Sequence, residues 1–267
     1  MIEPGLYEPT GPFHADDLTP GERYELVDGH PMYQAATGGD GASTVAVGVQ
    51  AIGSDPGAEE TGVDPGYVLD DTNVRAPDIA VGNVPDARGF IKGVPRLAVE
   101  YAGQRQDEVR LQEKIQAFLS RGTEQIWVVR LIGPRRVEVY RPGAAVVTLS
   151  TGQSLLAAGI LEYPIPVEAL FDKQSARAVA LRNYLSDVGY TSIDEIKSAG
   201  REEGREQGRC SALRDAIRDV LAARMIAIDP GLDEGLLGLR SAELQIALRR
   251  AAVCRTAAEV LAQDASG

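Results

Sequence analysis

Short runs of apolar and β-branched residues, several alternating with polar ones, recur through the first 150 positions, and this pattern predicts β-strands. Residues 24–32 contain two such runs around Asp28-Gly29, a dipeptide typical of a tight hairpin turn. Residues 38–41 and the acidic, glycine-rich stretch 53–66 predict loops. The small apolar run 44–52 fits either a helix or a buried strand. Further strands are expected at 77–81, 97–101, 125–129, 137–140 and 146–149.

A helical period of apolar positions interrupts the strands once and dominates after Phe171. Between residues 106 and 121, Leu111, Ile115, Phe118 and Leu119 recur at the spacing of one helix face, and Gly122 is expected to cap the helix end. Later helices are expected at 176–185, 195–225, 241–252 and 255–263. We therefore predict an α/β domain, a mixed sheet flanked by helices, over residues 1–174, and an all-helical tail over residues 175–267.

Composition places the chain among ordinary globular proteins, with one awkward feature. The 267 residues are 44% hydrophobic and carry a net charge of −12. Residues 1–172 hold 13 Lys+Arg against 25 Asp+Glu, whereas residues 173–267 hold 14 of each. Two cysteines argue against a disulfide framework or a cysteine zinc site. With no apolar run of membrane-spanning length and no signal-peptide pattern, we expect a cytoplasmic protein that does not contact a membrane.

Two strand-borne carboxylates are the strongest chemical signal. By strand periodicity Asp78 shares a face with Ala80, and Glu100 shares a face with Ala98. A carboxylate inside an apolar strand is costly unless it is paired or binds a metal. Two carboxylates on adjacent strands repel each other, and a divalent cation removes that repulsion. Hard oxygen ligands of this kind suit Mg²⁺ or Mn²⁺.

Lys114 lies beside the apolar stripe of the helix that follows the Glu100 strand. It falls at about 300° on a wheel with Leu111 at 0°, taking roughly 100° per residue. Its ammonium can reach the carboxylates, orient or activate a water, or offset charge on a phosphate. Alternatively, the side chain runs past the stripe to solvent. If Lys114 is catalytic, Lys114→Ala should abolish turnover and leave thermal stability nearly unchanged.

The order of several short segments resembles the Uma-two type of PD-(D/E)XK endonucleases, a restriction-endonuclease-like family. The similarity covers about residues 20–172. The segments are Tyr24-Glu25-Leu26-Val27-Asp28-Gly29, Arg75-Ala76-Pro77-Asp78-Ile79-Ala80-Val81, Pro95-Arg96-Leu97-Ala98-Val99-Glu100, Asp107, Lys114 and Gly122-Thr123-Glu124-Gln125-Ile126-Trp127-Val128-Val129.

The resemblance implies a restriction-endonuclease-like core that hydrolyses phosphodiester bonds of DNA with Mg²⁺ or Mn²⁺. Asp78, Glu100 and the backbone carbonyl of Tyr101 would bind the metal. Lys114 would position the attacking water, and Glu25 would help to orient the site from the first helix or strand. The chain departs from the pattern at Ala102, where the motif lysine would stand, at the following Gly103-Gln104, and at the loop 38–41, where a histidine is often found.

Two alternatives stay open on these observations: a catalytically inactive nuclease-fold protein that serves assembly or regulation, and a hydrolase of another phosphate ester. In the tail, Gly200, Gly204 and Gly208 are each followed by an arginine. Glycine at this interval weakens a helix but permits close helix packing. We therefore expect the C-terminal helices to form a homodimer or higher homo-oligomer, or to dock another protein.

Overall fold

A computed structural model describes residues 11–36, 38–104 and 107–262. The chain divides into two compact units, Met1–Gly189 and Tyr190–Gly267. This division falls later than the predicted boundary at residue 174. Helix α3 (Lys173–Asp187) accounts for the difference, because it packs against α1 (Gly39–Ile52) and the 3-10 helix η2 (Val167–Leu170) of the first unit.

The first unit is built on a six-stranded sheet in the order β11-β10-β9-β8-β6-β3. Strands β8 and β9 run parallel with helix α2 between them in sequence, and the other neighbours are antiparallel. The elements are β3 (Thr61–Val63), β6 (Ile79–Val81), β8 (Leu97–Ala102), α2 (Glu108–Leu119), β9 (Gln125–Arg130), β10 (Arg136–Tyr140) and β11 (Val147–Ser150).

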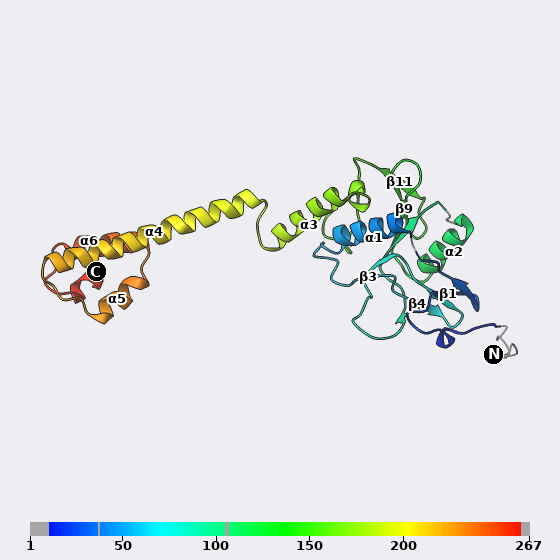
Figure 1. Cartoon of the computed structure of the whole chain (residues 1–267), viewed down its shortest axis with the longest axis horizontal. Coiled ribbons are helices and arrows are strands. Elements are labelled where there is room, and N and C mark those ends of the chain that lie inside the picture. Colours follow the sequence, from blue (N-terminus) through cyan, green and yellow to red (C-terminus); the bar gives the residue numbers. More distant parts are fainter. Residues whose placement is uncertain (1–10, 37, 105–106, 263–267) are drawn as a thin grey trace, which may run out of the picture. The chain divides into compact units, whose positions relative to one another are not determined.

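The two faces of this sheet are covered by different elements. Ile79, Val99 and Trp127 belong to a core that includes residues of α1, η2 and α3, which lie on one side of the sheet (Figure 1). Ala80 and Ala98 belong to a second core with the apolar stripe of α2. Small side chains on this second face let a helix approach closely, and that face is the one predicted for Asp78 and Glu100.

A second sheet, five-stranded in the order β2-β1-β5-β4-β7, contains the predicted hairpin. Asp28 and Gly29 both have positive φ (48° and 74°), as a two-residue turn of type I′ requires. Leu26 and Val74 form a small core with Ala15 beneath the sheet. The elements are η1 (Ala15–Asp17), β1 (Tyr24–Val27), β2 (His30–Tyr33), β4 (Tyr67–Asp70), β5 (Asn73–Arg75) and β7 (Ile91–Lys92); a two-stranded sheet adds β12 (Ser154–Leu155) and β13 (Ile165–Pro166).

The structure corrects several predictions from sequence. Residues 44–52 are helical, and the helix already starts at Gly39 inside the predicted loop 38–41. The predicted loop 53–66 contains β3, which has only three residues and pairs at the sheet edge. The short strands β4, β5 and β7 were not predicted. Helix α2 starts at Glu108 and ends at Leu119, and Gly122 has φ +112°, beyond the C-cap residue Ser120.

The described part of the second unit, up to residue 262, contains four helices with a hydrophobic core of their own. Helix α4 (Ile193–Ala223) contributes Cys210, Ile217 and Leu221 to this core. Helices α5 (Pro230–Leu237), α6 (Ser241–Ala251) and α7 (Ala258–Leu261) supply most of the rest. The short helix α5 was not predicted. In the part of the chain that the structure describes, no helix has the length and apolarity needed to cross a membrane.

Candidate active site

Asp78 and Glu100 face each other on neighbouring strands. Strands β6 and β8 pair antiparallel with Ile79 opposite Val99 and Ala80 opposite Ala98. Extending this register by one residue places Asp78, just before β6, opposite Glu100. Side chains at opposed positions of an antiparallel pair lie on the same face with Cβ atoms roughly 5 Å apart. The Oδ2 atom of Asp78 also accepts a hydrogen bond from the backbone N–H of Tyr101 (2.6 Å).

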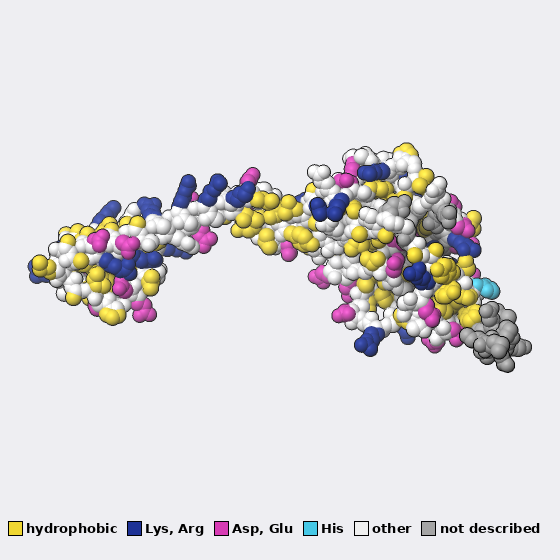
Figure 2. Space-filling view, viewed as in Figure 1, with side chains coloured by type: hydrophobic (Ala, Val, Ile, Leu, Met, Phe, Trp, Pro, Cys, Tyr) yellow, Lys and Arg dark blue, Asp and Glu magenta, His cyan; other side chains and the backbone are white. Residues whose placement is uncertain are grey.

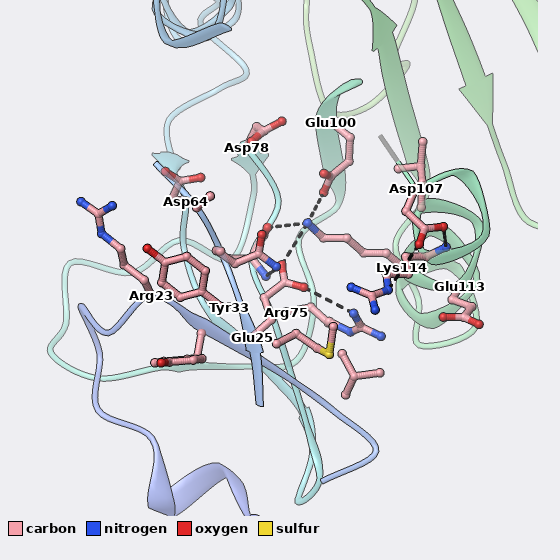
Figure 3. A pocket seen from close by; sticks show the side chains of 18 of the residues that line it. Arg23, Glu25, Tyr33, Asp64, Arg75, Asp78, Glu100, Asp107, Glu113 and Lys114 are labelled. Carbon is pink, nitrogen blue, oxygen red and sulfur yellow. Dashed lines mark hydrogen bonds and ion pairs between the residues drawn. The ribbon is translucent and has the colours of Figure 1, made fainter. Parts of the chain in front are cut away.

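Lys114 reaches this face from helix α2. Its Nζ lies 2.8 Å from Oε1 of Glu100 and 3.1 Å from Oε1 of Glu25, and it donates a hydrogen bond to the carbonyl of Ala76 (2.7 Å). Its side chain is only 14% exposed. The ammonium therefore points toward the carboxylates instead of running to solvent, as Figure 3 shows. Its place on the helix follows from Leu111 and Ile115, which anchor the buried stripe on either side of it.

Glu25 projects from β1 and is held at both oxygens. Oε1 accepts a hydrogen bond from the backbone N–H of Ala76 (3.1 Å), and Oε2 pairs with the guanidinium of Arg75 (3.3 Å). The side chains of Glu25 and Arg75 are 7% and 8% exposed. Burial would raise the pKa of Glu25, but Lys114, the Ala76 N–H and Arg75 together lower it. Glu25 is thus a fixed anion that holds the ammonium of Lys114. Of the two predicted alternatives, a helix or a strand, the structure places Glu25 on a strand.

The protonation of the other groups is set by burial and by their neighbours. Burial raises the pKa of Asp78, and it raises that of Glu100 to about 8 despite the nearby ammonium. For Lys114, burial alone would lower the pKa, but the three surrounding carboxylates outweigh it and the net shift is upward. The lysine is therefore a cation at neutral pH. The raised pKa values of Asp78 and Glu100 mean that one ammonium does not offset the cost of burying both carboxylates. An additional cation at this site would favour their ionised forms.

These groups line one cavity of about 690 Å³ between the two sheets and α2. The hairpin β1–β2 forms one wall, the segment from Arg75 to Asp78 another, and α2 a third. Asp64, which follows β3 and was predicted to lie in a solvated loop, also lines the cavity, and Figure 3 shows it on the Asp78 side. Asp107 lines the opposite side and caps α2, accepting hydrogen bonds from two backbone N–H groups.

The sequence indicated Asp78, Glu100, Lys114 and Glu25, and the structure brings all four to this cavity. The predicted role of the Tyr101 carbonyl stays a prediction; the contacts described for Tyr101 are made by its N–H and its hydroxyl. Arg75 and the backbone of Ala76 were missed as partners of Glu25. A buried arginine needs a counter-charge, but nothing local in the sequence identifies one that is 50 positions away.

Comparisons with known proteins give one family match and one similar solved structure. Residues 13–168 match the model of the family Uma2, described as "Putative restriction endonuclease". A solved structure described as a putative nuclease belonging to DUF820, from Anabaena variabilis, is similar with a TM-score of 0.52 and 17% identity. The similarity covers 61% of this chain and 99% of that one. No curated protein matches.

Proposed function

Because the chain belongs to the Uma2 family of putative restriction endonucleases, we propose that it is a divalent-metal-dependent endonuclease that hydrolyses phosphodiester bonds of DNA. The observation that supports this best is the pairing of Asp78 and Glu100 across β6 and β8, with the Lys114 ammonium supplied by α2. The helix substitutes for the missing motif lysine. Ala102, where that lysine would stand, is buried in the core on which α2 packs.

The residues present fit a magnesium or manganese ion. Oε1 of Glu100 is buried, and apart from its ion pair with Nζ of Lys114 (2.8 Å) it has no hydrogen-bond partner among the described residues. The described residues contain no group of three or more His, Cys, Asp or Glu side chains placed to hold a metal. Mg²⁺ commonly binds through one or two carboxylates and keeps several waters, so Asp78 and Glu100 would suffice. When bound, the ion supplies Lewis-acid polarisation of a phosphoryl oxygen and a more acidic water.

The chain's own residues divide the remaining tasks. Because the pKa of Lys114 is raised, the lysine acts as a positioned cation and not as a base. Its ammonium can donate to a water or to a phosphate oxygen and offset the charge that develops during hydrolysis. Glu25, fixed by Arg75 and Ala76, holds the ammonium in place. Asp78 is oriented by the N–H of Tyr101.

We also propose that the tail joins two copies of the chain or docks a protein partner. The first part of α4 leaves Ile193 and Ile196 exposed, and a Cβ atom added at Gly200, Gly204 or Gly208 would meet nothing within 4 Å. These positions lie along one side of the helix at roughly 100° per residue. A partner helix could therefore approach that side closely.

A plasmid-cleavage assay with Mg²⁺ or Mn²⁺ tests the nuclease proposal. The wild type should nick or linearise supercoiled DNA, EDTA should stop it, and Asp78→Asn should reduce the rate by about 100-fold or more. Asp86→Asn, an exposed aspartate away from the cavity, is the matched control. A wild type without metal-dependent cleavage would favour the alternative of an inactive assembly protein. Cleavage that survives Asp78→Asn would place the reaction elsewhere.

A further inference from the structure

The first half of helix α4 is surrounded by solvent. Residues 193–209 include no buried residue, whereas Cys210, Ile217 and Leu221 further along the same helix enter the tail core. This helix half therefore contributes no residue to the tail core. Its charged side chains are the most informative feature.

Four cations recur at exact four-residue steps along this exposed half: Lys197, Arg201, Arg205 and Arg209. Each step rises about 6 Å and turns about 40°, so the four span roughly 18 Å along one gently winding side of the helix. We call these four residues the basic stripe. In Figure 2 a row of Lys and Arg side chains follows this helix. The stripe is separate from the glycine side: Gly200, Gly204 and Gly208 each directly precede a stripe arginine, so the glycines form a parallel row about 100° around the helix.

The acidic residues of the same helix half are largely occupied. Glu195 accepts hydrogen bonds from the N–H and hydroxyl of Thr191, and Glu206 accepts two from Ser241 at the start of α6. Glu203 accepts one from Gln207. These three carboxylates are therefore used in capping and in contacts along and between helices of the tail.

The cations, in contrast, are available. Arg201 and Arg209 form no ion pair among the described residues. Lys197 pairs with Asp194 (3.6 Å) and Arg205 with Glu202 (3.9 Å), but all four of these side chains are at least 61% exposed. Such exposed pairs contribute little and exchange readily for another anion.

We propose that the basic stripe binds the phosphate backbone of nucleic acid. This extends the proposed nuclease function, which supplies nucleic acid as the partner. The charge of the nuclease unit favours such a surface outside that unit, because residues 1–172 carry almost twice as many acidic as basic residues. Duplex DNA has about one negative charge per 1.7 Å of axis with both strands counted, so a length of 18 Å carries about ten phosphates, of which the near side faces the stripe. Regularly spaced arginines match this array without reading its sequence.

Salt dependence of DNA binding tests the stripe. The full-length protein is titrated into a labelled 30-base-pair duplex in EDTA at several KCl concentrations, with fluorescence anisotropy as the readout. Replacing the four stripe residues by glutamine should weaken binding at least tenfold. It should also reduce the slope of log K against log[salt] by about 3 to 4, since each phosphate contact contributes about 0.9. Circular dichroism confirms that α4 remains helical.

A matched variant removes the same charge elsewhere. Arg88, Lys92, Lys173 and Arg177 are exposed cations of the nuclease unit, and replacing them by glutamine should change the slope by less than about 1. Equal effects of the two variants would show that binding depends on the net charge of the protein and not on the position of the stripe, and this would overturn the proposal. So would a stripe variant with unchanged binding, or one that only dissociates an oligomer in sedimentation.

The metal-free assay separates the two proposals. If the protein binds DNA through the stripe but does not cleave it with metal, the stripe proposal stands and the nuclease proposal fails. If the protein cleaves DNA with metal but its binding in EDTA does not depend on the stripe, the nuclease proposal stands and the stripe proposal fails.

Discussion

At the residue scale, Lys114 has two roles that cannot be separated by deletion. The same ammonium that faces the cavity also neutralises Glu25, a buried carboxylate whose pKa is lowered. Removing one partner of a buried ion pair leaves the other charge uncompensated, which typically costs about 3–5 kcal/mol. The expectation from sequence, that thermal stability is unaffected by the loss of this lysine, therefore needs revision.

Lys114→Met tests this revised account. We expect turnover to fall about 100-fold or more, because a positioned charge at the reacting phosphate is lost. We also expect the free energy of unfolding to fall by about 3 kcal/mol at neutral pH, because Glu25 would be left buried without its ammonium partner. Single-turnover cleavage well below the melting temperature and urea unfolding measure the two effects. Normal turnover would remove Lys114 from the site.

Glu100 should make the metal-free protein less stable as the pH rises. Burial raises its folded pKa to about 8 from an ordinary value of 4.5. Between these pH values the folded state keeps a proton that the unfolded state has released, so stability from this group is present at low pH and is lost toward pH 8.

We therefore predict that the melting temperature in EDTA falls less steeply between pH 5 and pH 8 in Glu100→Gln than in the wild type. Glu59→Gln, at an exposed glutamate, should keep the wild-type slope. Parallel curves for all three proteins would show that Glu100 ionises normally in the folded state.

At the scale of elements, the site could be predicted where a period was visible. The alternation in β6 and β8 and the stripe of α2 put Asp78, Glu100 and Lys114 on faces that turn out to meet. The second sheet could not be predicted. Strands β4, β5 and β7 were not recognised as separate short strands, and Arg75 finds Glu25 only through the pairing of β1 with β5. The place of Asp64 in the cavity was also not predicted, because Asp64 follows the three-residue strand β3.

Helix α2 depends on its N-cap. The side chain of Asp107 accepts hydrogen bonds from the N–H groups of Val109 (3.0 Å) and Arg110 (3.2 Å). Asp107→Ala should lower the free energy of unfolding of the nuclease unit by about 1 kcal/mol, the usual effect of losing such a cap. Ser192→Ala, which removes the cap of α4 in the tail, should leave the unfolding of the nuclease unit unchanged. Chemical denaturation followed by the fluorescence of Trp127, a core residue of the unit, reports it selectively.

At the scale of the whole molecule, two hydrophobic cores share no residues. The main core of the nuclease unit ends with α3, and the tail core begins at Cys210. Removing residues 190–267 should therefore leave the nuclease unit folded, with its cavity intact, because no lining residue comes from the tail. If the tail joins copies of the chain, the truncated protein should sediment as a monomer and the full chain as a larger species. A full chain that is monomeric at tens of micromolar would contradict self-association and leave docking to another protein.

The most direct test of the central claim is metal binding itself, measured by calorimetric titration of Mn²⁺ into the purified protein. The account predicts saturable binding by the wild type. Asp78→Asn and Glu100→Gln should each weaken it by more than the ten- to hundredfold typical of losing an outer-shell partner. Asp86→Asn should bind like the wild type. Mn²⁺ binding that is undiminished in both site variants, or absent from the wild type, would contradict a metal centre on Asp78 and Glu100.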